Sequence, residues 1–302
     1  MTESDMASLD CLILCAGRGE RLRPLTDVCP KPLIPILGVT MADRALVACE
    51  RLSPARRFAN AHHLGEQIQF WAEARSLDHV QIEKILLDTG GALAMLRPDI
   101  ASEHLLVHNG DILHDIDLVP AWKAHIASRA AATLLMVDLP RVNTVRHRAG
   151  RFAGVAGHPR CPADALTDSV AATFSGIAFY RVRDLGARPV EPWSVKELWH
   201  DLLESGSLVQ CWLAPPTSIW EDLGTPKELA TAILREAKGE WIHPEAHVSP
   251  GAILGSDVVV EYEARVGAGA FVSRSVVLPG AEVAPGEVLD GILRNPGGDL
   301  PW

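Results

Sequence analysis

Short apolar runs alternate with helical patterns over roughly the first 240 residues of the chain. Apolar runs typical of buried strands lie at residues 9–16, 57–61, 104–107 and 131–137, and helical patterns lie at 42–52, 65–74 and 118–127. This alternation predicts an α/β fold with a doubly wound, mostly parallel sheet. Ligands of such sheets bind beyond the carboxyl ends of the strands, where residues 17–21 and 109–111 fall.

The C-terminal pattern is different, because aliphatic residues there recur at every sixth position. The series is Ile242, Val248, Leu254, Val260, Val266, Val272 and Leu278, with glycine, proline and small residues between its members. A period of six resembles the hexapeptide repeat of a left-handed β-helix, although a β-hairpin tail is an alternative. The pattern predicts a flexible tail over residues 1–8, an α/β domain over 9–239 and a β-helix domain over 240–302.

Composition restricts the classes of protein further. The 302 residues carry 38 acidic and 28 basic side chains, a net charge of −10, which disfavours a nucleic-acid binder with a wide basic surface. The six cysteines lack metal-ligand spacing, so neither a zinc site nor a disulfide framework is expected. The sequence shows no signal peptide and no long uncharged apolar run, so we expect a cytoplasmic protein without membrane contact.

One segment concentrates positive charge despite the acidic total. Gly17 and Gly19 follow the first predicted strand and leave backbone N–H groups open to an anion. The same stretch adds four cations that suit phosphate oxygens, namely Arg18, Arg21, Arg23 and Lys31. A structural turn with solvated arginines is the alternative. The whole cluster favours a phosphate-binding loop.

Two carboxylates are candidates for a metal site. Asp111 follows a buried strand and the pair Asn109-Gly110, and Asp222 precedes a helix start at Thr225-Pro226. Carboxylate oxygens are typical ligands of Mg²⁺, a hard ion that also binds substrate phosphates. Asp111 could instead serve only as a turn residue.

The loop as a whole resembles a known family signature. Residues Gly17-x-Gly19-x-Arg21-x-x-Pro24-Leu25-Thr26, followed by Pro30-Lys31-Pro32, are similar to the motif of the sugar-1-phosphate nucleotidyltransferases, or NDP-sugar pyrophosphorylases. Members often carry a C-terminal hexapeptide β-helix. The stretch from Asn60 to Glu66 resembles N-acetylmuramate-1-phosphate uridylyltransferases and their mannose-1-phosphate guanylyltransferase relatives. The resemblance implies a Rossmann-like fold and the Mg²⁺-dependent synthesis of an NDP-sugar and pyrophosphate from UTP or GTP and a sugar 1-phosphate.

The resemblance also implies roles for individual residues. Arg21 and Lys31 would be catalytic, and Asp111 and Asp222 would bind Mg²⁺, with Asp115 and Glu221 as less favoured neighbours. The nucleotide would be bound by Ala16, Gly17, Arg18, Gly19, Thr89, Gly90, Gly91 and Asn109. The sugar phosphate would be bound by Asn60, Gly176 and Lys196. For Thr89 a helix cap, for Asn60 a helix entry and for Lys196 a solvated surface position remain the alternatives.

The chain departs from the family pattern at two positions. Gly38-Val39-Thr40 stands where a Gly-Lys/Gln-Pro segment is usual, and Asp88 stands where many members have glycine. Both departures concern base or sugar contacts and leave the phosphate chemistry unchanged. The sugar-phosphate nucleophile is already anionic, so no catalytic histidine is expected.

Other functions fit the sequence less well. A catalytically silent paralogue that senses NDP-sugars would not need the intact Arg21, Lys31, Asp111 and Asp222. A glycosyltransferase would favour a D-x-D motif, and Asn109-Gly110-Asp111 lacks its first acid. A dinucleotide-dependent dehydrogenase would need the third glycine of GxGxxG, which residues 17–22 lack. The short β-helix is expected to mediate homo-oligomer contacts and not acyl transfer.

Overall fold

The computed structural model describes residues 7–140 and 142–302, whose contacts form two compact units. The sheet unit comprises the chain up to residue 16 together with residues 45–110 and 114–220. The β-helix unit comprises residues 17–44, 111–113 and 221–302. Each unit is therefore assembled from segments that lie far apart in the sequence.

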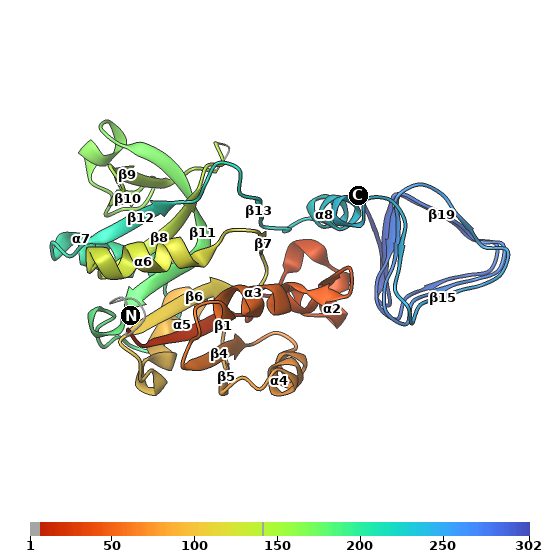
Figure 1. Cartoon of the computed structure of the whole chain (residues 1–302), viewed down its shortest axis with the longest axis horizontal. Coiled ribbons are helices and arrows are strands. Elements are labelled where there is room, and N and C mark those ends of the chain that lie inside the picture. Colours follow the sequence, from red (N-terminus) through yellow and green to blue (C-terminus); the bar gives the residue numbers. More distant parts are fainter. Residues whose placement is uncertain (1–6, 141) are drawn as a thin grey trace. The chain divides into compact units, whose positions relative to one another are not determined.

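A nine-stranded sheet forms the centre of the sheet unit (Figure 1). In spatial order its strands are β5 (His79–Ile82), β4 (Arg56–Ala61), β1 (Leu9–Leu14), β6 (His104–Asn109), β11 (Val170–Arg181), β8 (Ala132–Val137), β12 (Val209–Leu213), β10 (Arg151–Val155) and β9 (Val145–Arg148). β5, β4, β1 and β6 pair in parallel, and so do β8 and β12, whereas β11 is antiparallel to both β6 and β8. The predicted α/β fold with a mostly parallel sheet is confirmed, and the antiparallel strands β9, β10 and β11 complete it.

Helices cover both faces of this sheet. The long strand β11 makes the arrangement clear, because adjacent residues of a strand point to opposite faces. On one face Tyr180 accepts a hydrogen bond of 3.0 Å from Trp199 of α7. On the other face the rings of Trp122 and His125 of α6 pack against Phe179. The helices whose bounds lie in this unit are α4 (Gly65–Ala74), α5 (Asp88–Leu96), α6 (Leu118–Ser128) and α7 (Val195–Glu204), with the 3₁₀ helices η3 (Arg97–Asp99), η4 (Ala163–Leu166) and η5 (Val182–Asp184).

Short helices and a coil of very short strands form the β-helix unit. Its first segments hold η1 (Glu20–Leu22), α2 (Leu25–Val28), η2 (Lys31–Leu33), β2 (Pro35–Ile36) and β3 (Val39–Thr40), and α8 (Pro226–Ala237) precedes the coil. Three elements lie at the junctions of the segments: α3 (Met41–Glu50), β7 (Leu113–His114) and β13 (Trp220–Glu221). Thr225 caps α8 through a capping box with Glu228, and Pro226 occupies the first helical position, as the sequence predicts.

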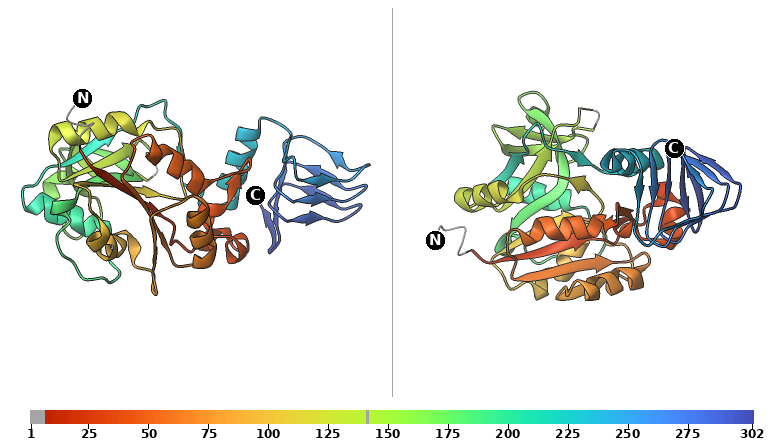
Figure 2. Two further views of the ribbon diagram at one scale, coloured as in Figure 1. Left: turned by 60° about the horizontal axis from the view of Figure 1, so that its bottom comes forward. Right: turned by 45° about the vertical axis from the view of Figure 1, so that its right-hand side comes forward.

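Three sheets form the coil, which Figure 1 shows end-on and Figure 2 shows from the side. The first sheet contains the parallel strands β14 (Trp241–Ile242), β17 (Val258–Val260), β20 (Ser275–Val277) and β23 (Ile292–Asn295), and β24 (Gly298–Pro301) pairs antiparallel with β23. The second contains β15 (His247–Val248), β18 (Arg265–Val266) and β21 (Glu282–Val283), and the third contains β16 (Ile253–Leu254), β19 (Phe271–Ser273) and β22 (Val288–Asp290). These parallel pairings confirm the predicted β-helix.

The register of the coil corrects one position of the sixfold series. Ile242 pairs with Val260, a separation of 18 residues, but Val260 pairs with Val277, a separation of 17. Val277 therefore lies in the aliphatic interior of the coil, whereas Leu278 belongs to the core that the coil shares with α8. The coil shortens by one residue after its first turn, so a strict period of six assigns Leu278 to the wrong side.

The compact units also differ from the predicted domains. α8 ends at Ala237, its C-cap Lys238 adopts a left-handed conformation, and the coil begins at Trp241, so the change of pattern near residue 240 is real. The unit that contains the coil nevertheless includes residues 17–44, because Leu22, Ile34 and Val276 belong to one hydrophobic core. The division into domains 9–239 and 240–302 stays a prediction. Residues 1–6 of the predicted tail lie outside the described residues, and Ser8 accepts a hydrogen bond from the His104 N–H.

None of the helices in the described part of the chain combines the length and apolarity that crossing a membrane requires.

Candidate functional site

The β-helix unit brings together four of the residues that the sequence selects for phosphate and metal chemistry. The ammonium of Lys31 lies 2.9 Å from Oδ2 of Asp111, 3.4 Å from Oδ1 of Asp222 and 2.6 Å from the carbonyl oxygen of Asp222. The guanidinium of Arg21 lies 3.4 Å from the other carboxylate oxygen of Asp222. Residues 21, 31, 111 and 222 thus form one cluster, which we call the Lys31 cluster.

Burial differs within the Lys31 cluster. The side chain of Lys31 is only 6% exposed, whereas those of Asp111 and Asp222 are 32% and 50% exposed. The 65% exposure of Arg21 leaves its guanidinium open to solvent. The buried ammonium is therefore neutralised by two partly exposed carboxylates, and partly exposed carboxylate oxygens are available to a hard cation.

The backbone of the loop explains why glycine occupies two of the motif positions. Gly19 has a left-handed φ of +60°, and a Cβ built there would meet Cγ2 of Thr26 at 2.7 Å. The hydroxyl of Thr26 donates to the Gly19 carbonyl oxygen, which fixes the turn. Around Gly17, by contrast, nothing lies within 4 Å of a built Cβ, so this backbone is open to a ligand.

Gly224 is a contributor that sequence reasoning did not select. A Cβ at Gly224 would come within 2.3 Å of the Arg21 guanidinium, so a larger residue would force Arg21 to move from its place beside Asp222. The stretch Asp222-Leu223-Gly224-Thr225-Pro226 contains this glycine, but the sequence does not show which side chain faces it. The neighbouring carboxylate Glu221 pairs instead with Arg235 at 2.5 Å, and Arg18 forms an exposed pair with Glu20 at 3.8 Å.

In the sheet unit, the amide of Asn60 joins the ends of two strands. Its oxygen accepts from the Cys15 N–H at 2.6 Å, and its nitrogen donates to Glu83 at 2.7 Å. The second oxygen of Glu83 accepts from the Leu87 N–H at 2.9 Å. Burial raises the pKa of Glu83, and the Leu87 and Asn60 hydrogen bonds oppose that rise. Asn60 is 3% exposed, so it acts here as a strut, and its predicted contact with the sugar phosphate stays a prediction.

The paired glycines of the predicted base-binding loop lie against another part of the same unit. A Cβ at Gly90 would meet the Trp193 ring at 2.1 Å, and one at Gly91 would meet the Glu191 carbonyl oxygen at 2.2 Å. The Gly90 N–H donates to the Trp193 carbonyl oxygen at 3.1 Å. Close packing therefore requires these glycines. The helix begins at Asp88, so Thr89 lies inside its first turn and is not the cap.

Asn109, the last residue of β6, lies beside Gly176 in the middle of β11. Gly176 has a φ of +85° at an irregularity of β11, and a Cβ there would meet the Asn109 amide nitrogen at 2.6 Å. Because Gly176 has no side chain, the Asn109 amide fits beside it. Lys196 is exposed in the first turn of α7, which Ser194 caps. Asp115 accepts from the Ile219 N–H at 2.7 Å and serves a local turn.

Two histidines flank Asn109 in the chain, of which His108 is fully buried and His114 is partly exposed. His108 and His114 face each other through their Nε2 atoms at 2.8 Å, while the Ile116 N–H donates to Nδ1 of His114. Burial lowers the pKa of His108 to about 3 and that of His114 to about 4, and the charge of His114 lowers the pKa of His108 further. Both rings are neutral near neutral pH, and the Nδ1–H of His108 donates to the Asn109 carbonyl oxygen.

Comparison with known proteins agrees with this chemistry. The nucleotidyl transferase family model matches residues 10–146. A mannose-1-phosphate guanylyltransferase of Mycobacterium tuberculosis is 27% identical over an alignment of 316 residues. The alignment covers 93% of this chain and 83% of that protein. An N-acetylmuramate alpha-1-phosphate uridylyltransferase of Neisseria meningitidis is 30% identical over 242 residues, which cover 77% of this chain and 100% of that protein.

Solved structures share the fold at lower sequence identity. HddC from Yersinia pseudotuberculosis, complexed with GMP-PN, is 18% identical with a TM-score of 0.59, covering 75% of this chain and 99% of that one. A putative glucose-1-phosphate thymidylyltransferase from Bacillus anthracis, also 18% identical, gives a TM-score of 0.63 and covers 78% and 97%. Motif, fold and relatives therefore agree that the chain belongs to the sugar-1-phosphate nucleotidyltransferase family and is an enzyme of that class.

Proposed function

We propose that the chain transfers a nucleotidyl group from UTP or GTP to a sugar 1-phosphate in a Mg²⁺-dependent reaction. The observation that carries the proposal is the Lys31 cluster, in which a buried ammonium meets two carboxylates within 3.4 Å. Phosphoryl-type transfer asks a protein mainly for positioning and for neutralisation of charge. The Lys31 cluster supplies one fixed cation and oxygen donors for another.

The reaction needs little covalent chemistry from the protein. An oxygen of the sugar phosphate attacks the α-phosphorus in line and forms the new P–O bond. The bond from the α-phosphorus to the bridging oxygen breaks, and pyrophosphate leaves with that electron pair. Because the nucleophile is already anionic, no general base is required, which agrees with the neutral state of His108 and His114. Lys31 and Arg21 stabilise the charge that gathers on the phosphate oxygens.

The donor set fits Mg²⁺. Asp111 and Asp222 direct carboxylate oxygens at a single point, the ammonium of Lys31, and Mg²⁺ commonly binds through one or two carboxylates together with substrate phosphates. No cluster of three or more histidine, cysteine or acidic side chains suited to a metal occurs among the described residues. When bound, the ion would supply Lewis-acid neutralisation of the phosphate oxygens.

The remaining contacts are assigned by the family motif. Ala16, Gly17, Arg18, Gly19, Thr89, Gly90, Gly91 and Asn109 are proposed to bind the nucleotide, and Asn60, Gly176 and Lys196 the sugar phosphate. The open backbone at Gly17 and the exposed ammonium of Lys196 support two of these roles directly. Gly90 and Gly91 already pack against residues 191–193, so we propose that they act by holding the loop close to that segment.

The relatives support both nucleotides. The guanylyltransferase matches 93% of the chain at 27% identity, and the uridylyltransferase matches 77% at 30% identity. GTP and UTP are therefore the first two substrates to test. A mannose- or aminosugar-type 1-phosphate is the corresponding acceptor class.

A pyrophosphate-release assay tests the proposal. Four nucleoside triphosphates are combined with a panel of hexose and aminosugar 1-phosphates, with Mg²⁺ and with EDTA. We expect turnover for GTP or UTP with one sugar phosphate, abolished by EDTA. Absence of turnover for every pair, together with NDP-sugar binding in calorimetry, would favour the silent sensing paralogue.

We also propose that the enzyme forms a homo-oligomer through the β-helix. Register aligns Ile253, Phe271 and Val288 on the outside of the third sheet, where they are 58%, 38% and 69% exposed. The outside of the second sheet carries His247, Arg265 and Glu282 instead. The apolar row supports contact with a second copy of the chain. Sedimentation velocity of wild type and Phe271→Ser tests it: we expect a smaller species for the variant, and an equal size would contradict the proposal.

A further inference from the structure

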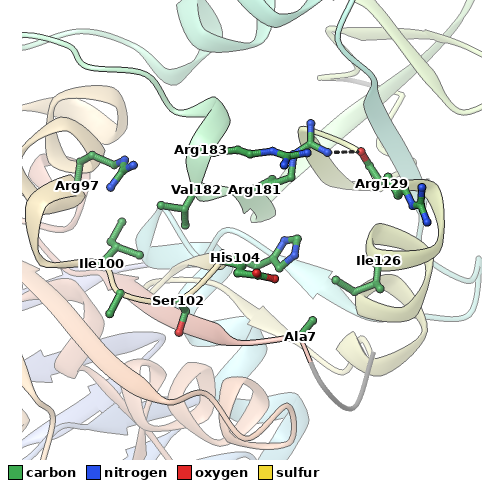
Figure 3. A pocket seen from close by; sticks show the side chains of 12 residues that line it. Ala7, Arg97, Ile100, Ser102, His104, Ile126, Arg129, Arg181, Val182 and Arg183 are labelled. Carbon is green, nitrogen blue, oxygen red and sulfur yellow. Dashed lines mark hydrogen bonds between the residues drawn. The ribbon is translucent and has the colours of Figure 1, made fainter. Parts of the chain in front are cut away.

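The sheet unit contains a cavity of about 600 Å³ that the proposed reaction does not use (Figure 3). It lies where β1 and β6 begin and β11 ends, beside Ala7, His104 and Arg181. Asn109 lies at the other end of β6, about 16 Å away at the usual rise of a strand. The volume is within the range of small-molecule sites.

The lining of this cavity is strongly basic. Four arginines and one acidic residue contribute to it: Arg97, Arg129, Arg181, Arg183 and Glu103. Arg181 pairs with Asp184. Over residues 7–140 and 142–302, no carboxylate lies within ion-pair distance of Arg97, Arg129 or Arg183. Three guanidinium groups are thus left without a counter-charge in a protein whose net charge is −10.

Apolar side chains accompany the arginines. Figure 3 shows Arg97 and Arg129 on opposite sides of the cavity, with Ile100 and Ile126 beside them and Val182 between the arginines. This combination suits a ligand with a charged group and a ring, since guanidinium groups bind phosphate oxygens bidentately and apolar surfaces receive a ring.

Hydrogen bonds hold the walls of the cavity in place. Buried Asp10 accepts from the Ser102 hydroxyl at 2.8 Å and from the Ser102 N–H at 3.2 Å. The Val182 N–H donates to the Glu103 carbonyl oxygen at 2.8 Å, and Arg181 donates to the Arg129 carbonyl oxygen at 3.0 Å. These hydrogen bonds fix the backbone that carries the arginines. Less conformational entropy is therefore lost when a ligand binds.

We propose that this cavity binds a phosphate-bearing small molecule, with the phosphate on Arg97, Arg129 and Arg183 and a ring on the apolar side chains. The site is separate from the residues that follow the carboxyl ends of β1 and β6, and the proposal does not rest on the proposed reaction. A nucleoside monophosphate and a phosphorylated sugar share the required chemistry. A long nucleic acid does not, because the basic surface is confined to one cavity.

Isothermal titration calorimetry on the full chain tests the proposal. GMP, glucose 6-phosphate and inorganic phosphate are titrated separately into the wild type, an Arg97→Ala/Arg183→Ala variant and an Arg51→Ala/Lys123→Ala variant. The last is the charge-matched control, because Arg51 and Lys123 are exposed and lie outside the cavity lining. We expect at least one probe to bind the wild type and the control equally, and to bind the cavity variant at least tenfold more weakly.

The pattern of probes identifies the source of the phosphate. Binding of GMP alone indicates a nucleotide, binding of glucose 6-phosphate alone indicates a sugar phosphate, and binding of both indicates recognition of the phosphoryl group. Absence of binding for all three probes, or equal binding to the cavity variant, would overturn the proposal. Thermal melting checks that the variant is folded, and Arg97→Gln/Arg183→Gln replaces it if it is not.

Discussion

Positive charge gathers at two places in this acidic protein, and the two differ in how the charge is neutralised. In the Lys31 cluster the ammonium is buried and contacts Asp111 and Asp222. In the basic cavity of the sheet unit, Arg97 and Arg183 have no carboxylate partner among the described residues. A cation that already has carboxylate partners is held in position before substrate binds. A group of cations without such partners attracts an anionic ligand. The comparison distinguishes the proposed reaction site from the proposed binding site.

The largest effect is expected for Lys31→Ala, which removes the centre of the paired cluster. Loss of one preorganised charge costs on the order of 10²–10³ in kcat. The two carboxylates would then repel each other, and the free energy of unfolding should fall by about 1–3 kcal/mol, since they are partly solvated. Steady-state kinetics and chemical denaturation measure both quantities. The control is Lys227→Ala, an exposed lysine outside the cluster, and equal losses in both variants would contradict the role of Lys31.

A smaller loss of activity is expected for Gly224→Ala. The added methyl group would meet the Arg21 guanidinium at 2.3 Å and displace it from Asp222. We expect kcat to fall by roughly tenfold, which corresponds to about 1.4 kcal/mol. If the effect acts through Arg21, the substitution should change little in an Arg21→Ala background. Additive losses in the double variant would show that Gly224 acts in another way.

Local sequence patterns predicted much of the secondary structure, because strands and helix ends depend on interactions between residues that are close together in the chain. The run at residues 9–16 and the cap at Thr225-Pro226 mark a buried strand and a helix start without reference to the rest of the chain. The spacing of six identified the coil, but it could not detect the one-residue shortening between Val260 and Val277. That change depends on packing between turns.

Contacts between segments that lie far apart in the chain were harder to predict from the sequence. The motif selected Lys31, Asp111 and Asp222, yet the need for glycine at 224 follows from Arg21, 203 positions earlier, whose guanidinium would meet a Cβ there. The strut formed by Asn60 and Glu83, and the packing of Gly90 on Trp193, likewise depend on pairings that no local pattern encodes. The basic cavity was not foreseen, because its arginines come from positions 97, 129 and 183.

A buried carboxyl group extends the comparison to the β-helix unit. Glu261 is fully buried and accepts from the Gly38 N–H, and burial raises its pKa to about 7. The folded state then holds a proton that the unfolded state releases, so stability should decrease as the pH rises from about 4.5 to 7. Chemical denaturation against pH should show a decline of about 2 kcal/mol that Glu261→Gln reduces. The exposed Glu240→Gln is the matched control, and an unchanged slope in Glu261→Gln would contradict this prediction.

The smallest effect concerns the unpaired arginines. Because like charges repel, Arg97→Ala/Arg183→Ala should raise the free energy of unfolding by about 0.5 kcal/mol at low salt, and the gain should vanish at 1 M salt. This sign is opposite to that expected for Lys31→Ala. Differential scanning calorimetry at two ionic strengths measures it. A salt-independent loss of stability would mean that these arginines are paired in solution.

The central claim is that Asp111 and Asp222 form a Mg²⁺-dependent reaction site around Lys31. The most direct test is pyrophosphate release as a function of Mg²⁺ concentration for the wild type and Asp111→Asn, with GTP or UTP and the preferred sugar 1-phosphate. We predict that the variant needs at least tenfold more Mg²⁺ for half-maximal rate and that its maximal rate falls on the order of 10²-fold. An identical Mg²⁺ dependence in the two proteins would contradict the account.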